Sequence, residues 1–308
     1  MKRNILKGAF WVLLSISTVS CSDFLDINPH DSISDAAVWE NMDLAEAFLN
    51  NCYTYVEGEN ENGVPFCSYT DELFHRTGYA TEVYTLGNVS CDNYNVGFSE
   101  ARGNTWNFYY SGIKKVNQLL ENIDKVPAVS DSEETRKAEI IGQAYFLRAF
   151  FYHQLYSLYG RIPLVDHTFD IDSDWVETRA DDVADFIVKD CESAIEKLPL
   201  KYESSDDFGR ATRGAAMAVK ARTLLYKASP LFGEPSTEKW QEAAKASKDI
   251  IDLGVYSLPT VSSSEEYAAL FYNTQNPEII FEKLYNNKGT YGSALHYLFQ
   301  SPNGPYNG

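Results

Sequence analysis

The sequence has little positive charge. It holds 26 lysine and arginine residues against 44 aspartate and glutamate residues, a net charge of −18, with a pI of about 4.6. Nucleic-acid binding depends on lysine- or arginine-rich faces that neutralise phosphate, and the sequence contains no such patch. We therefore expect no nucleic-acid partner.

The sequence also lacks the common catalytic motifs. It contains no G-x-S-x-G, no H-E-x-x-H and no P-loop, and its five histidines are scattered without metal-ligand spacing. DIDSD at 170–174 resembles the start of a calcium loop, but the glycine and glutamate that such a loop requires are replaced by Trp175 and Asp181. We expect no enzymatic activity, no cofactor and no metal. A glycosidase carboxylate pair stays open as an alternative, because it has no sequence signature.

Cysteine is scarce and never occurs as C-x-x-C, which argues against a zinc site. Four cysteines follow Cys21, at positions 52, 67, 91 and 191. Four thiols allow three disulfide connectivities, and four buried free thiols are equally compatible with the sequence. The sequence does not decide between these alternatives.

No hydrophobic run is long enough to span a bilayer. The longest lies in residues 1–20, after a basic start at Lys2, Arg3 and Lys7, and predicts a signal peptide. Cys21 follows the small residue Ser20, as in a bacterial lipobox, and a polar segment comes next. We favour a lipoprotein with lipid on Cys21 and a tether over 21–35. An ordinary signal peptide is the alternative.

Helical periodicity dominates the rest of the chain. Ser34 or Asp35 is expected to cap the first helix, Thr212 is expected to cap the fifth, and Gly254 is expected to end the sixth. The predicted helices cover 36–56, 106–126, 130–159, 181–198, 212–229, 238–254 and, more briefly, 264–271.

The fourth to sixth helices begin about 30 residues apart, close to the 34-residue period of tetratricopeptide units. The full signature of that repeat is absent, so the sequence predicts a mainly α fold of degenerate helical pairs. Strand signals are few. The alternating segment 277–285 is the best of them.

The run AYFLRAFFYHQLYSLYGRIPLV at 144–165 is rich in aromatic and aliphatic residues. It could be a membrane span, an aromatic ligand cage or a core helix. Polar residues such as Arg148, His153 and Gln154 interrupt it, which argues against a span. Because its apolar residues cover nearly the whole helix surface, we predict a buried core helix.

The sequence has 21 tyrosines, and many lie in two stretches without helical periodicity, 57–103 and the tail after 285. Aromatic faces beside asparagine or aspartate can stack on sugar rings and hydrogen-bond their hydroxyls. The same aromatics could instead pack the loops onto the helices, and both roles stay open. The candidate ligand-binding residues are Tyr79, Tyr84, Asn93, Tyr94, Tyr291, His296 and Tyr297.

FLRAFFYHQLYSLYGRIPLV resembles the most recognisable segment of the SusD/RagB family, the surface nutrient-binding lipoproteins of Bacteroidetes. Other segments resemble family landmarks in the right order, and together they cover nearly all of residues 21–285. They are CSDFLDINP, VWENMDLAEAFLNNCYTYV, WNFYYSGIKKVNQLLENI, GRATRGAAMAVKARTLLYKASPLF, WQEAAKASKDIIDLGVYSL and EYAALFYNTQNPEIIFEKLY.

The resemblance implies a SusD-like fold of helical pairs with an irregular, loop-rich lobe. It further implies a non-catalytic protein that captures glycan at the cell surface, anchored in the outer membrane through Cys21. The protein would deliver its ligand to a SusC-like TonB-dependent transporter. The alternatives are a peptide-capturing RagB-like binder and a helical-repeat scaffold for protein interactions. The resemblance does not name the glycan.

Family members are usually markedly longer. We therefore expect a SusD-like domain over 36–285, with a loop-rich insertion at 57–103, and an incomplete second lobe that begins at 286–308. On this expectation the chain is truncated in its C-terminal part.

Overall fold

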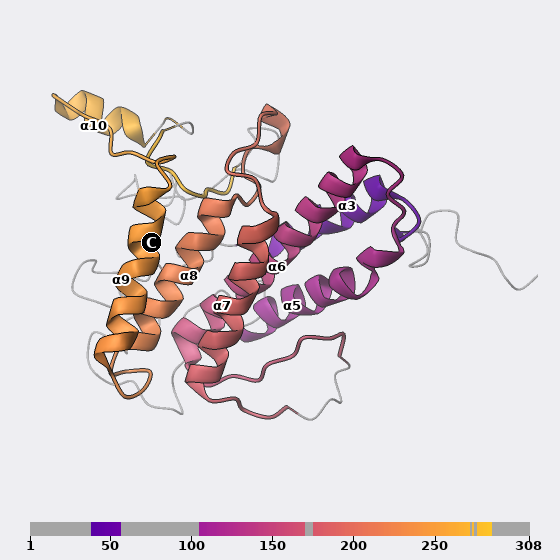
Figure 1. The fold of residues 1–308 in the computed structure, drawn as a ribbon, viewed down its shortest axis with the longest axis horizontal. Helices are drawn as coiled ribbons and strands as arrows, with labels where there is room; N and C mark the ends of the chain where they lie inside the picture. The colour runs from indigo at the N-terminus through magenta and orange to yellow at the C-terminus, as the bar shows by residue number, and fades with distance from the viewer. Residues whose placement is uncertain (1–37, 57–104, 170–174, 272, 274–275, 285–308) are drawn as a thin grey trace, which may run out of the picture. The chain divides into compact units, whose positions relative to one another are not determined.

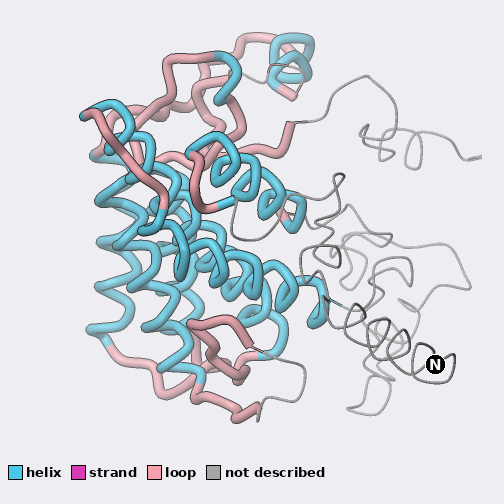
Figure 2. Tube along the Cα trace, turned by 90° about the vertical axis from the view of Figure 1, so that its right-hand side faces the viewer, coloured by secondary structure: helices cyan, strands magenta, loops and turns pink. Residues whose placement is uncertain are grey.

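The computed structural model describes residues 38–56, 105–169, 175–271, 273 and 276–284. The chain divides into two units, Met1–Val38 and Trp39–Gly308, and all the elements below belong to the second. The described residues form seven α-helices and no strand (Figure 2). The helices are α3 (Met42–Cys52), α5 (Thr105–Asn122), α6 (Asp131–Tyr159), α7 (Ala180–Lys197), α8 (Arg213–Ala228), α9 (Thr237–Asp252) and α10 (Ser264–Leu270).

The helices from α5 to α9 follow one another in space as they do in sequence (Figure 1). Each packs against the next, and α3 packs against both α5 and α6. The connections 123–130 and 229–236 are short, which makes α5 and α6, and likewise α8 and α9, antiparallel neighbours. The predicted mainly α array of helical pairs is confirmed.

Side-chain caps set most of the helix starts. Ser130, Thr212, Ser236 and Ser263 each accept a hydrogen bond from a backbone N–H in the first turn of α6, α8, α9 and α10, respectively. Gly254, just past α9, has φ +65°, a conformation that only glycine adopts freely. The predicted roles of Thr212 and Gly254 are confirmed.

Helix α6 is the centre of the core, because it packs against α3, α5, α7 and α8. Its aromatic and aliphatic side chains are buried on several sides at once, as its sequence predicts. The residues with no exposed surface are Ala144, Phe146, Leu147, Ala149, Phe151, Tyr152, Leu155 and Tyr156. The run at 144–159 is therefore a core helix, neither a membrane span nor a ligand cage.

A buried ion pair crosses from α6 to α7. Arg148 binds Asp190 through two nitrogens, at 2.7 and 2.8 Å, and it also donates to Asn117 Oδ1 at 2.9 Å. The amide of Asn117 in turn donates to the carbonyls of Val165 and His167. The cluster thus holds the loop after α6 against α5 and α7.

Two predicted helix boundaries in the first part of the chain are wrong. The helix expected over 36–56 is interrupted, because Asn41 is extended and caps a new helix by accepting from the N–H groups of Asp43 and Leu44. Ser34 and Asp35, the predicted caps, lie outside the described residues. The second helix ends at Asn122 rather than Val126, and a 3-10 turn, η5 (Ile123–Lys125), follows it.

The strand predicted over 277–285 is also wrong for its described part, 277–284. Its start is a turn, in which the N–H of Ile279 donates to the carbonyl of Asn276. Phe281 then packs edge-on against Phe146 and Phe150 of α6. The apolar residues of this segment thus pack against helix α6. No described strand lies beside the segment to form β-ladder hydrogen bonds with it.

Cys52 and Cys191 are free and buried. Burial raises the pKa of the Cys52 thiol to about 12 and raises that of Cys191 as well. Such thiols are inert at neutral pH. Cys67 and Cys91 lie outside the described residues.

Candidate functional site

The residues predicted from the sequence to carry function all lie outside the described residues. They are Cys21, Tyr79, Tyr84, Asn93, Tyr94, Tyr291, His296 and Tyr297. The acidic segment 170–174 lies there too. Their roles stay predictions.

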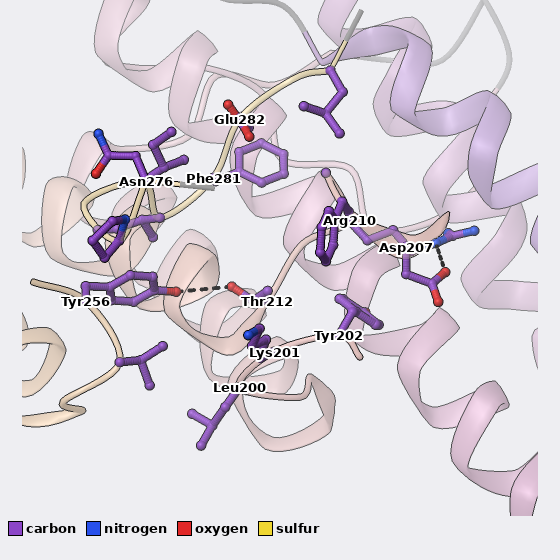
Figure 3. Close-up of a pocket in the computed structure, with 17 residues that line it drawn as sticks. Leu200, Lys201, Tyr202, Asp207, Arg210, Thr212, Tyr256, Asn276, Phe281 and Glu282 are labelled. Carbon is purple, nitrogen blue, oxygen red and sulfur yellow. Dashed lines mark hydrogen bonds and ion pairs between the residues drawn. The ribbon is translucent and has the colours of Figure 1, made fainter. Parts of the chain in front are cut away.

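The described residues do form a pocket of about 380 Å³ within the unit Trp39–Gly308 (Figure 3). Its walls come from the loop that joins α7 to α8, from residues 255–256 after α9, and from the segment 276–284. Tyr256 and Thr212 lie on one side, Tyr202 and Arg210 on the other, and Phe281 and Glu282 lie across from Lys201. The volume is within the range of small-ligand pockets, about 300–1,000 Å³.

Local backbone features shape the α7–α8 loop. Helix α7 ends before Pro199, whose carbonyl accepts from the N–H of Arg213 at 2.9 Å and so brings the two ends of the loop together. Between them, η6 (Ser205–Asp207) leads to Gly209, which has φ +87°. A Cβ at Gly209 would lie 3.3 Å from Leu284, so glycine also allows the segment 276–284 to approach.

Arg210 ties the pocket wall to the helical core. It donates to Asp207 at 2.8 Å, to Glu46 of α3 at 2.7 Å, and to Asn50 and Gln143 at 3.0 and 3.3 Å. Its guanidinium is therefore paired with two carboxylates and held by four residues. Glu46 and Asp207 neutralise its charge before any ligand arrives.

Tyr53 fixes the end of the same loop. Its hydroxyl donates to Gln143 Oε1 at 2.8 Å and accepts from the N–H of Ala211 at 3.0 Å. Burial raises the pKa of Tyr53, so it stays a neutral hydrogen-bonding group. Arg210 and Tyr53 together make the wall rigid.

Tyr202, on the same wall, has a hydroxyl that is fully buried and has no hydrogen-bond partner among the described residues. Burial raises the pKa of Tyr202. A buried hydroxyl without a partner costs about 1–3 kcal/mol. A hydrogen bond to the Tyr202 hydroxyl would remove that cost.

On the opposite wall, Tyr256 lies against the first turn of α8. Its hydroxyl is 3.4 Å from Thr212 Oγ1. A Cβ at Gly214 would collide with the Tyr256 side chain, so the tyrosine depends on a glycine at that position. Between the walls, the half-buried Glu282 has a pKa raised by burial.

Both apolar and polar side chains line the pocket. No histidine, cysteine or serine is among its lining residues, which combine aromatic and aliphatic surface with a few polar groups. Elsewhere in the described ranges, no group of three or more His, Cys, Asp or Glu could hold a metal ion.

The sequence does not predict this pocket, because its residues come from three separate segments of the chain, 200–212, 255–256 and 276–284. GRATRGAAM predicts a helix start and PEIIFEKLY a strand, and both resemble family landmarks, but neither pattern indicates a pocket. The one usable signal was Gly209 before Arg210, since glycine in a polar loop indicates a special backbone conformation.

Among the described helices, none combines the length and the apolar character that a membrane crossing demands.

A family model described as "Starch-binding associating with outer membrane", SusD-like, matches residues 23–225. Two curated SusD-like proteins of Formosa agariphila are 23% and 24% identical to the chain. The matches cover 94% and 88% of this chain but 56% and 50% of those proteins. The chain thus spans about half the length of the curated relatives it matches.

Solved structures share the fold. A SusD-like protein from Bacteroides fragilis matches with a TM-score of 0.62 and 24% identity, over 87% of this chain and 49% of that one. A laminarin-binding SusD-like protein matches with a TM-score of 0.56 and 19% identity, over 71% of this chain and 47% of that one. The matched helical array, the family model and the curated relatives agree, and the chain belongs to the SusD-like family.

Proposed function

We propose that this protein binds glycans at the cell surface, without catalysing a reaction on them, and delivers them to a SusC-like TonB-dependent transporter of the outer membrane. The observation that carries the proposal is membership of a family described as starch-binding and associated with the outer membrane. A laminarin-binding protein with the same fold supports a glycan as the ligand.

The ligand contacts that we propose lie in two aromatic stretches, 60–103 and 285 onward. Tyr79, Tyr84 and Tyr94 would stack on sugar rings, and Asn93 would hydrogen-bond hydroxyls. Tyr291, His296 and Tyr297 would contribute from the tail. The rigid helical array α5–α9 would carry these loops, as scaffolds usually carry binding loops.

We further propose that residues 1–20 are a signal peptide, that Cys21 carries the lipid and that 21–35 is a tether. The protein would then face the cell exterior from the outer membrane, where polysaccharide fragments arrive. The helical domain would extend over 36–285, and 286–308 would begin a second lobe.

Calorimetric titration of the full chain in detergent tests the proposal. We expect binding to at least one member of a panel that includes maltoheptaose, laminarihexaose and charged oligosaccharides. Tyr84→Ala and Tyr94→Ala are each expected to weaken that binding by about tenfold, since aromatic anchors dominate such sites. Tyr267→Ala is the control, because Tyr267 is an exposed tyrosine of α10.

Affinity purification from Bacteroidetes membranes tests the delivery step. We expect a TonB-dependent transporter, identified by mass spectrometry, to purify with the chain. Binding to no glycan together with the absence of any transporter would overturn the proposed function.

A further inference from the structure

The pocket of Figure 3 offers hydrogen-bonding groups that the protein leaves unused. Within the described residues, the Tyr202 hydroxyl has no partner and the Tyr256 hydroxyl has only the long contact to Thr212. The carboxylate of Glu282 has no hydrogen bond or ion pair within the same residues, and burial alone raises its pKa. Tyr256 and Glu282 thus offer polar groups to a ligand, and Tyr202 has a buried hydroxyl that still lacks a partner within the described residues.

The same pocket has an apolar half. Phe208, 38% exposed, and Phe281 line it together with aliphatic side chains such as Ile279 and Leu284. A sugar ring has apolar C–H faces and a rim of hydroxyls, so it needs both kinds of surface close together. A groove that was only apolar would favour a protein or lipid segment.

The charges of the pocket cancel. Among the lining residues, Lys201 and Arg210 are positive, and Asp207 and Glu282 are negative. Arg210 pairs with Asp207 and with Glu46, which lies outside the lining and also pairs with Arg136. An anionic or cationic ligand would leave a net charge in a partly buried site, which is costly. A neutral ligand leaves none.

We propose that this pocket is a subsite for a neutral sugar, holding one or two hexose rings of the captured glycan. Tyr202, Tyr256 and Glu282 hydrogen-bond its hydroxyls, and Phe208 and Phe281 pack on its C–H faces. The inference rests on the proposed function and adds to it a site in the helical domain and a preference for neutral glycans. The volume of about 380 Å³, near the small end of ligand pockets, suits a short piece of a chain.

Calorimetric titration of the full chain, in detergent, with maltoheptaose and laminarihexaose tests the subsite. The variants are Tyr202→Phe, Tyr256→Phe and the double variant. Each single variant is expected to weaken binding about three- to tenfold, the value of one hydrogen bond of about 0.5–1.5 kcal/mol. The double variant is expected to lose more than either. Tyr267→Phe, which removes a hydroxyl outside the pocket, is expected to bind like the unaltered chain.

Folding is not at risk in Tyr202→Phe, because the lost hydroxyl has no partner among the described residues, and its melting temperature should not fall. If the unaltered chain and all tyrosine variants bind a glycan equally, the subsite is overturned and the proposed function stands.

If no glycan binds the unaltered chain, the glycan-binding part of the proposed function fails and the subsite fails with it. If the chain binds only galacturonate oligomers or chitosan oligomers, the preference for a neutral sugar is wrong. A diazirine-bearing maltoheptaose supplies a second readout. Cross-links to peptides from 200–212 or 276–284 support the subsite, and cross-links confined to other peptides contradict it.

Discussion

Arg148 and Asp190 are the residues whose replacement we expect to damage the fold most. Their side chains are only 8% and 4% exposed and are joined by two hydrogen bonds. Burial raises the pKa of Asp190, and the hydrogen bonds from Arg148 oppose that shift. The carboxylate therefore depends on its partner.

Arg148→Ala is predicted to lower the free energy of unfolding by about 3–5 kcal/mol, because it leaves a buried carboxylate without its cation. Urea denaturation measures the loss. Arg161→Ala is the control: its ion pair with Glu177 is 62% and 54% exposed, and such pairs contribute about 0–1 kcal/mol. Similar losses in the two variants would contradict the importance of the buried pair.

His153 makes stability depend on pH. Burial, with a smaller contribution from Arg222, lowers its pKa to about 4. Thr223 Oγ1 donates to the carbonyl of Val219, so it accepts from His153 Nδ1, a bond that fits the neutral ring. Above pH 6.5 the ring is neutral whether the chain is folded or unfolded. Between pH 6.5 and about 4 only the unfolded chain gains the proton, so stability falls as the pH falls.

From pH 6.5 to pH 5 this loss is expected to reach about 2 kcal/mol. His153→Gln removes the titrating group, so its stability should fall less over the same range. Urea denaturation at several pH values compares the two chains. Parallel stability curves would contradict the assignment, because the remaining carboxylates titrate equally in both.

For single residues, the sequence predicts which side chains are buried but not which residues they contact. The spacing of Phe146, Leu147 and Phe151 indicates a buried helix on its own. The pairing of Arg148 with Asp190 spans 42 positions and depends on how α6 and α7 are packed, which no local pattern records.

At the scale of elements, glycines mark where helices approach most closely. A Cβ at Gly112 of α5 would lie 2.9 Å from the Phe151 ring of α6 and 3.0 Å from Tyr55. A Cβ at Gly142 of α6 would lie 2.9 Å from Lys197 of α7. At both positions the backbone packs directly against neighbouring side chains. A residue larger than glycine would force those side chains to move.

Gly112→Ala is predicted to destabilise the protein. Alanine favours the helix by about 1 kcal/mol, but overpacking against the Phe151 ring costs about 1–3 kcal/mol. A net loss of about 1 kcal/mol in urea denaturation is expected. Ser111→Ala, at the exposed neighbouring position of α5, should change stability by less than about 0.5 kcal/mol. A gain in stability for Gly112→Ala would show that the helices can move apart freely.

Helix starts were predictable where a serine or threonine precedes the periodic run, as at Ser130 and Thr212. They were not predictable at Asn41, because the residues before it, 36–40, continue the apolar rhythm and hide the break. For the segment 277–284, the local pattern predicted a strand that tertiary contact prevents. Its alternation fits a strand, but contact of Phe281 with α6 decides its conformation.

At the scale of the whole molecule, the order of the landmark segments was enough to identify the family, and the family determined the fold. The pocket could not be found this way, because it exists only once three distant loops meet. The predicted ligand loops, 57–103 and the tail after 285, lie outside the described residues, so the site expected in them stays a prediction.

Cys21→Ala is predicted to release the protein from the membrane fraction of cells that express it, since the lipid provides the anchor. Fractionation followed by immunoblotting measures this. Loss of [³H]palmitate labelling in the same variant ties the effect to lipid. A variant that remains in the membrane fraction would contradict the anchor.

Hydrogen–deuterium exchange of the full chain, with and without saturating laminarihexaose or maltoheptaose, tests the central claim most directly. We predict that one of these glycans slows exchange in peptides from 60–103 and from 285 onward, and in the pocket segments 200–212 and 276–284, while α9 is unchanged. Exchange that neither these two glycans nor any other member of the titration panel alters in any of these segments would contradict glycan capture by this protein.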